Sequence, residues 1–266
     1  MYKLNEALGQ ELLTTTTVRL KPLYQRLSIA RLLGVAGLLL TVSACSTFGS
    51  GDGTVDGALV FYTEREGKGQ QPFKTRIFVT KEFLRLSDDR AKDDFILFDR
   101  EDKIIYNVNS ADKTIMVIES QEVKTKPPME IDYQEQSQPS AAIPSVDGNS
   151  ATHFRYSANG EHCYDVVSLG PKFIPELGKA MSEFRQVLAG EHSKTISSTP
   201  SHMLDACDLA LNVYHPADHL KNGFPLREWG PNGYSRFIIY YRTKDKMEEK
   251  YLELPDGYER FSISGS

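Results

Sequence analysis

Short runs of β-branched and aromatic residues, separated by turns, constrain this fold more than any other sequence feature. They follow one another from Ala58 to Glu119, with turns of two to six residues between them. Strands this close in sequence pair most readily as an antiparallel meander. The segment IIYNVNSADKTIMVI (104–118) is the clearest hairpin, with β-branched and aromatic residues on both arms. The expected strands are 58–64, 73–80, 82–87, 94–99, 103–109 and 113–119.

Two of these strands are apolar at every position, at 95–98 (FILF) and 115–118 (IMVI). Strands of this kind are covered on both faces. Two arrangements satisfy this condition: a helix packs inside the curve of the sheet, or the curve holds an apolar ligand. If the curve holds a ligand, the residues expected to line the cavity are Phe95, Leu97, Ile115, Val117, Phe237 and Ile239.

Residues 120–150 change in character, with four prolines, many Gln and Ser residues and few large apolar ones. This composition predicts a long, mobile loop or lid over the sheet. A β-hairpin is expected next, at 153–158 and 162–169, because Asn159-Gly160 between them is a strong turn signal.

Helices are expected after this hairpin. Apolar residues at helical spacing predict an amphipathic helix at 172–189, and a second helix is expected at 203–214. Two further strands are expected at 234–243 and 247–253, and a short one at 261–263.

This order of elements across residues 57–264 resembles the lipoprotein-carrier-like superfamily, which has the LolA-like fold. The segment Gly223-Phe224-Pro225-Leu226, the paired strands after it and the ending LELPDGYERF add to the resemblance. The resemblance implies an α+β fold, in which a curved antiparallel half-barrel has one or two helices over its concave face. It implies no catalytic residues, and the loop at 120–150 and the extra cysteine pair depart from the pattern.

The N-terminal segment indicates export. An apolar run at 32–41, about half the length of a membrane-spanning helix, follows several basic residues, as in a signal peptide. The next four residues, Val42-Ser43-Ala44-Cys45, resemble the lipobox of bacterial lipoproteins. The resemblance implies removal of residues 1–44, acyl chains such as palmitate on Cys45, and a flexible tether at 45–56 before a single domain at 57–266. Because Ser46 rather than aspartate follows the cysteine, it also implies an outer-membrane lipoprotein facing the periplasm.

Charge and cysteine usage agree with export. Residues 1–44 hold five of the 31 basic and two of the 36 acidic residues, so the remaining chain has a net charge of −8. An acidic domain is a poor candidate for binding nucleic acid. Beyond Cys45 the chain has two cysteines, Cys163 and Cys207. An even pair in an exported chain is a disulfide candidate, with two buried thiols as the alternative.

The sequence gives only weak evidence for a catalytic or metal-binding site. His215 and His219 have the spacing of two zinc ligands on a helix, but Pro216 lies between them and no HExxH glutamate is present. His162 and Cys163 are adjacent on an expected strand, so their side chains diverge. Ser168 lacks a GxSxG elbow. The acidic pairs Asp88-Asp89 and Asp93-Asp94 lie at expected turns, and no calcium loop, metal site or cofactor is expected.

The sequence therefore favours a protein that is not an enzyme. One hypothesis is a membrane-anchored, carrier-like module that binds a lipid or another apolar ligand. The alternative is a structural or assembly protein of the envelope, which fills its own cavity and acts through contacts with partner proteins.

Overall fold

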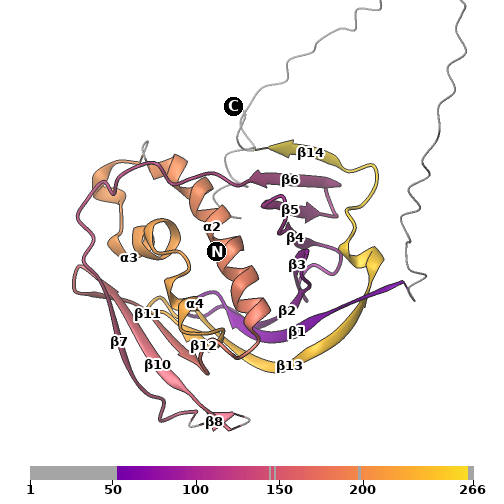
Figure 1. Ribbon diagram of the computed structural model, residues 1–266. Helices are drawn as coiled ribbons and strands as arrows, with labels where there is room; N and C mark the ends of the chain where they lie inside the picture. The colour runs from indigo at the N-terminus through magenta and orange to yellow at the C-terminus, as the bar shows by residue number, and fades with distance from the viewer. Residues whose placement is uncertain (1–52, 144, 147, 197–198, 263–266) are drawn as a thin grey trace, which may run out of the picture. The chain divides into compact units, whose positions relative to one another are not determined.

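A sheet of 12 strands makes up most of the described chain, in the order β14-β6-β5-β4-β3-β2-β1-β13-β12-β11-β10-β7 (Figure 1). This computed structural model describes residues 53–143, 145–146, 148–196 and 199–262. Neighbouring strands are antiparallel, except for the parallel pair β14 and β6. Figure 1 shows the sheet curving around helix α2 (Pro175–Ile196), which confirms the predicted α+β fold.

The first half of the sheet is the predicted meander. Its strands are joined by short turns, and each pairs with the next along the chain. The first strand begins inside the segment predicted as a tether, because Val55 is partly buried against the core. The strands are β1 (Thr54–Arg65), β2 (Phe73–Val79), β3 (Phe83–Asp88), β4 (Phe95–Asp99), β5 (Ile104–Asn109) and β6 (Thr114–Glu119).

The second half of the sheet differs from the prediction at two places. Within the predicted loop at 120–150, residues Tyr133–Pro139 form edge strand β7, and the two-residue strands β8 (Ser145–Val146) and β9 (Asn149–Ser150) pair with each other. The two strands expected at 234–253 form one strand, β13 (Ser235–Glu248), which ends in the 3₁₀ turn η3 (Glu249–Leu252). The remaining strands are β10 (Thr152–Ala158), β11 (Glu161–Ser168), β12 (Pro225–Trp229) and β14 (Glu259–Ser262).

Helix α2 packs on one face of the sheet, here called the inner face. Its apolar stripe is buried, and the ring of Phe184 meets the ring of Phe98 from β4 at 5.8 Å. The helix begins and ends later than predicted, since Pro175 is its first residue. The other helical segments are short: η1 (Ser201–Met203), α3 (Ala206–Leu209), the π-helix η2 (Ala210–Tyr214) and α4 (Asp218–Lys221). The expected helix at 203–214 is therefore three consecutive segments.

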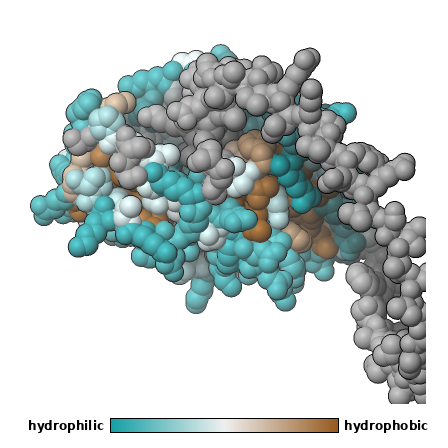
Figure 2. All heavy atoms as spheres, turned by 90° about the horizontal axis from the view of Figure 1, so that it is seen from above, coloured by the Kyte–Doolittle hydropathy of each residue, from teal (hydrophilic) through white to brown (hydrophobic). Residues whose placement is uncertain are grey.

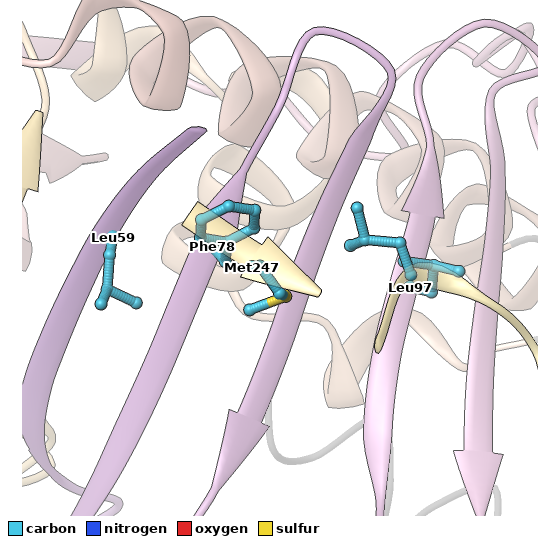
Figure 3. Close-up of a cluster of buried hydrophobic side chains, with 5 residues drawn as sticks. Leu59, Phe78, Leu97 and Met247 are labelled. Carbon is cyan, nitrogen blue, oxygen red and sulfur yellow. The ribbon is translucent and has the colours of Figure 1, made fainter. Parts of the chain in front are cut away.

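The opposite, outer face of β1 to β5 is covered by the C-terminal part of the chain. Leu97 points away from α2 because adjacent strand residues alternate, and it packs with Leu59 and Phe78 (Figure 3). Met247 and Leu252 cover this cluster from the end of β13 and from η3. Arg85 fixes the covering segment, since its Nη1 donates to the carbonyl oxygen of Tyr251 at 2.8 Å. The apolar strand 95–98 is thus covered on both faces by the chain itself.

A disulfide joins Cys163 of β11 to Cys207 of α3, with a Cα–Cα distance of 5.2 Å. This confirms the predicted pair and attaches the short α3 to the sheet. Seen from above, hydrophobic residues form small areas between hydrophilic ones (Figure 2). Of the helices that the structure describes, none is long and apolar enough to cross a membrane.

Candidate functional site

A groove lies between the first half of α2 and the segment around α4. One wall begins in the loop after β11, where Pro171 and Phe173 lead into the helix. Pro175 at the first helical position needs no N–H partner and has a backbone angle suited to the helix. Leu220 and Phe224 form the opposite wall.

Gly223 brings the two walls together. Its φ is +102°, and a Cβ placed on it would lie 2.2 Å from the carbonyl oxygen of Gly170. Only glycine allows both this conformation and this approach of the two backbones. The opening Gly223 of the Gly-Phe-Pro-Leu segment is therefore required by the geometry of the groove.

The groove has a volume of about 290 Å³, with apolar walls and polar groups at its rim. This volume is near the lower end of the usual range for small-molecule sites. Gly178 lies on the helix side, and a Cβ added to it would meet no atom within 4 Å. The lining residues are Pro171, Phe173, Pro175, Gly178, Lys179, Ser182, Glu183, Gln186, Leu220, Lys221, Gly223 and Phe224.

Arg100 holds α2 in place beside the groove. It is 5% exposed, its Nε donates to Glu183 Oε2 at 2.8 Å, and its Nη1 donates to the carbonyl oxygen of Thr80 at 2.7 Å and to Glu176. Burial alone raises the pKa of Glu183, but the hydrogen bond and charge of Arg100 outweigh it and hold that pKa below the usual range. Glu183 is therefore engaged with the sheet and contributes little negative charge to the groove.

A buried charge cluster lies on the inner face beneath Phe224. The ring of Phe224 packs on Tyr62, and the Arg236 guanidinium lies 4.8 Å from the centre of that tyrosine ring. Arg236 pairs with Glu228, which is 0% exposed, and lies 4.0 Å from Glu64. Buried charges are tolerated only when they are paired in this way.

His219 completes this buried cluster and is neutral in the folded protein. It is 1% exposed, and its Nε2 lies 3.8 Å from Glu228 Oε1. Burial, together with the charges of Arg185 and Arg236, lowers the pKa of His219 well below its ordinary value. This cluster is enclosed and lies outside the groove lining, so we assign it a structural role.

A second polar cluster lies on strands β10 and β11. Asp165 is 0% exposed, and its Oδ1 accepts from His153 Nε2 at 2.7 Å and from Arg155 Nε at 3.1 Å. His162 Nε2 lies 2.6 Å from Oδ2, without the alignment of a hydrogen bond. This cluster was not predicted from the sequence, although the hairpin turn at Asn159-Gly160 places Arg155 opposite Asp165.

Comparisons with known proteins assign neither a family nor a function. No protein-family model matches the sequence, and no curated protein matches it. Among solved structures, the chain is similar to PNGF-II in the C2 crystal form, at 7% identity and a TM-score of 0.39, over 79% of this chain and 31% of that one. The chain is also similar to PNGF-II in the P21 crystal form, at 8% identity and a TM-score of 0.37, over 79% of this chain and 32% of that one. The chain thus spans about a third of the length of these structures, and neither similarity is close enough to support an argument.

The predicted cavity residues lie in two places, both away from the α2–α4 groove. Leu97 is buried in the outer-face cluster, and Phe95 packs against it. Strand register places Ile115 and Val117 on this same outer face. Phe237 and Ile239 are each 45% exposed on β13. Cys45 lies outside the described residues.

The structure separates the histidines that the sequence brings together. His215 Nδ1 lies 2.9 Å from Asp218 Oδ2 and the imidazole ring stacks on Tyr133, whereas His219 points into the buried cluster. Within the described part of the chain, no group of three or more His, Cys, Asp or Glu side chains is placed to hold a metal ion. His162 is next to a disulfide-bonded cysteine, which has no thiolate to act as a nucleophile.

The buried neutral His219 predicts that acid destabilises the fold. Because its folded pKa is depressed, only the unfolded chain takes up this proton below pH ~6.5, and stability falls as the pH drops. We expect a loss of about 1.4 kcal/mol per pH unit below that value. Urea unfolding at pH 7.5 and 5.5 measures it. The His219→Gln variant should keep only a smaller pH dependence, partly from His192, whose pKa burial also lowers. An unchanged pH dependence in this variant would exclude His219 as the source.

Proposed function

We propose that this chain is an exported, non-enzymatic lipoprotein, anchored to the outer membrane by acyl chains on Cys45, which binds an apolar ligand bearing negative charge in the α2–α4 groove. The observation that carries this proposal is the composition of the groove. Its walls are apolar, at Phe173, Leu220 and Phe224. The exposed lysines Lys179 and Lys221 also line it, and Lys221 pairs with Asp218 Oδ1 at 2.6 Å. An acyl chain with an anionic head has this pattern of chemistry.

The position of α2 favours this groove over the interior of the sheet. The helix occupies the inner face with fully buried side chains, including Leu177 and Phe184. A ligand on that face would have to displace the helix and break the hydrogen bonds of Arg100 to Glu183 and Glu176. The groove requires no such displacement, since Gly178 leaves its helix wall open.

Substitution of Gly178 tests the proposal at a single position. Gly178→Phe should fill the groove and weaken binding at least tenfold, because nothing within 4 Å blocks the new side chain. Gly178→Ala is the matched control, since it should retain binding and stabilise the helix by about 1 kcal/mol. Binding is measured by the fluorescence of dansylundecanoic acid, whose emission rises in an apolar site.

Lys179 provides a second readout. Charge reversal at Lys179 should weaken binding of the anionic probe while leaving the unfolding midpoint almost unchanged, because Lys179 is exposed. Lys221 is left in place because it pairs with Asp218. Probe binding that is the same in the wild-type chain and in Gly178→Phe would contradict the groove as the site.

The alternative function, a structural or assembly protein of the envelope, is favoured by one observation. The chain covers both faces of strand 95–98 with its own residues. A protein that fills its own sheet in this way acts through its surface. Failure of the wild-type chain to bind the probe would favour this second function.

A further inference from the structure

The outer face of β13 carries an exposed group of aromatic and aliphatic side chains. Phe237 and Ile239 are each 45% exposed and Tyr240 is 40% exposed. Strand pairing places Tyr240 opposite Phe61, which packs on the outer-face cluster, and Phe237 opposite Thr63, two residues further along the same face of β1. Ile239 lies at the register shift between these two pairs. Exposed large apolar side chains gathered on one strand indicate a contact surface.

Basic side chains surround this group. Arg242 pairs with Leu59 of the outer face, and Arg227 pairs with Phe237 from the neighbouring strand β12. Lys74 of β2 lies opposite Thr63 on the other side of β1. All three are exposed, and the acidic neighbour Asp245 lies 3.5 Å from Arg242. We call Lys74, Arg227, Phe237, Ile239, Tyr240 and Arg242 the β13 face.

The charge of the β13 face is opposite to that of the chain as a whole. The chain beyond residue 44 has a net charge of −8. The β13 face has three basic residues, and even with Asp245, the ion-pair partner of Arg242, its net charge is +2. Aromatic rings next to Arg and Lys are typical of surfaces that lie at a membrane–water interface. An acidic protein would approach an anionic bilayer favourably only through such a face.

The length of chain between Cys45 and β1 limits how far the domain can lie from a membrane anchor at that residue. Seven residues lie between Cys45 and Gly53, and the eight Cα–Cα steps span at most about 29 Å when fully extended. Strand β1 then runs beside β13, and from Thr54 to the pair Phe61–Tyr240 it rises by about 23 Å. A chain anchored at Cys45 therefore allows β1 and β13 to lie along the bilayer surface.

We propose that the β13 face docks the domain onto an anionic lipid bilayer. Phe237, Ile239 and Tyr240 enter the interfacial region, while Arg227, Arg242 and Lys74 contact anionic head groups. The orientation of the domain on the bilayer rests on the proposed anchor at Cys45. Binding of the β13 face to the bilayer does not require that anchor. It uses a surface distinct from the α2–α4 groove.

Trp229 makes the proposal directly testable, since it is the one tryptophan in the chain. It lies next to Arg227 on the outer face, with the guanidinium 5.0 Å from the centre of its ring. The chain from Ser46 to Ser266 contains all the described strands and lacks the proposed anchor. Mixed with vesicles of phosphatidylglycerol and brominated phosphatidylcholine, it should show quenched tryptophan fluorescence, and sedimentation should show stronger binding than to vesicles without phosphatidylglycerol.

Substitutions in the β13 face test whether this surface makes the contact with the vesicles. The Arg227→Ala/Arg242→Ala chain should bind the anionic vesicles about 25-fold more weakly, and Phe237→Ser/Tyr240→Ser should also bind more weakly. Met203→Ser, which removes an apolar side chain that is 67% exposed outside this face, is the matched control and should bind like the wild type.

Three results would overturn the docking proposal: no binding to anionic vesicles, binding without quenching of Trp229, or binding that the β13 variants do not change. Gly178→Phe should bind these vesicles normally. Failure of docking and failure of the ligand groove are therefore seen separately.

Discussion

Replacing Arg236 with methionine is expected to lower the free energy of unfolding by about 3–5 kcal/mol. The substitution keeps most of the volume of the side chain but removes its charge. Glu228, which is 0% exposed, then loses its partner, and Glu64 at 7% exposure loses a neighbouring cation. An unpaired charge in this position cannot be solvated without opening the sheet between β1, β13 and β12. Urea unfolding at neutral pH measures the loss.

A double variant distinguishes loss of the ion pair from loss of packing. When Glu228→Met is combined with Arg236→Met, Glu228 is no longer left as a buried unpaired charge, and only Glu64 still lacks the neighbouring cation. Replacement of a buried ion pair by apolar residues is often nearly neutral. The double variant should therefore be more stable than Arg236→Met alone. A double variant that loses the sum of the two single losses would show that the pair contributes nothing as a pair.

The second large effect is expected at the disulfide. Replacing Cys163 and Cys207 together with alanine should cost about 4 kcal/mol, because the bond closes a loop across a sequence separation of 44 residues and restricts the unfolded chain. The native state also depends on it locally, because α3 is only four residues long. We expect a lower urea midpoint and earlier proteolysis near 200–210.

Reduction of the wild-type chain is the control for this variant. Dithiothreitol should lower the midpoint of the wild type to near that of the double alanine variant and leave the variant itself unchanged. Equal stability of the oxidised wild type and the variant would mean that the cross-link restricts the unfolded chain very little.

The meander was predictable from sequence because each strand pairs with its neighbour along the chain. Turn residues then set the boundaries, as at Asn159-Gly160, where β10 and β11 pair as expected. Strand 95–98 has apolar residues on both of its faces, which predicted that other parts of the structure or a ligand would pack on each face. The sequence left open what supplies that cover, and α2 and the segment after β13 supply it.

Other elements were not predictable because tertiary contacts determine them. Strand β7 is polar and exposed along most of its length, and it forms through pairing with β10 and through contacts of Tyr133 with His215. In β12, Glu228 would be read as a surface residue, yet it is buried because Arg236 lies opposite. The groove depends on the approach of Gly223 to Gly170, which are far apart in sequence.

Native mass spectrometry of the chain from Ser46 to Ser266 tests the proposed ligand site most directly. The protein is purified without detergent and without reductant, both as the wild type and as Gly178→Phe. We predict a wild-type mass above that of the polypeptide, with an excess that disappears on denaturation and is absent from Gly178→Phe. The bare polypeptide mass in both, less the hydrogens lost to the Cys163–Cys207 bond, would contradict the proposal and favour an assembly protein that acts through its surface.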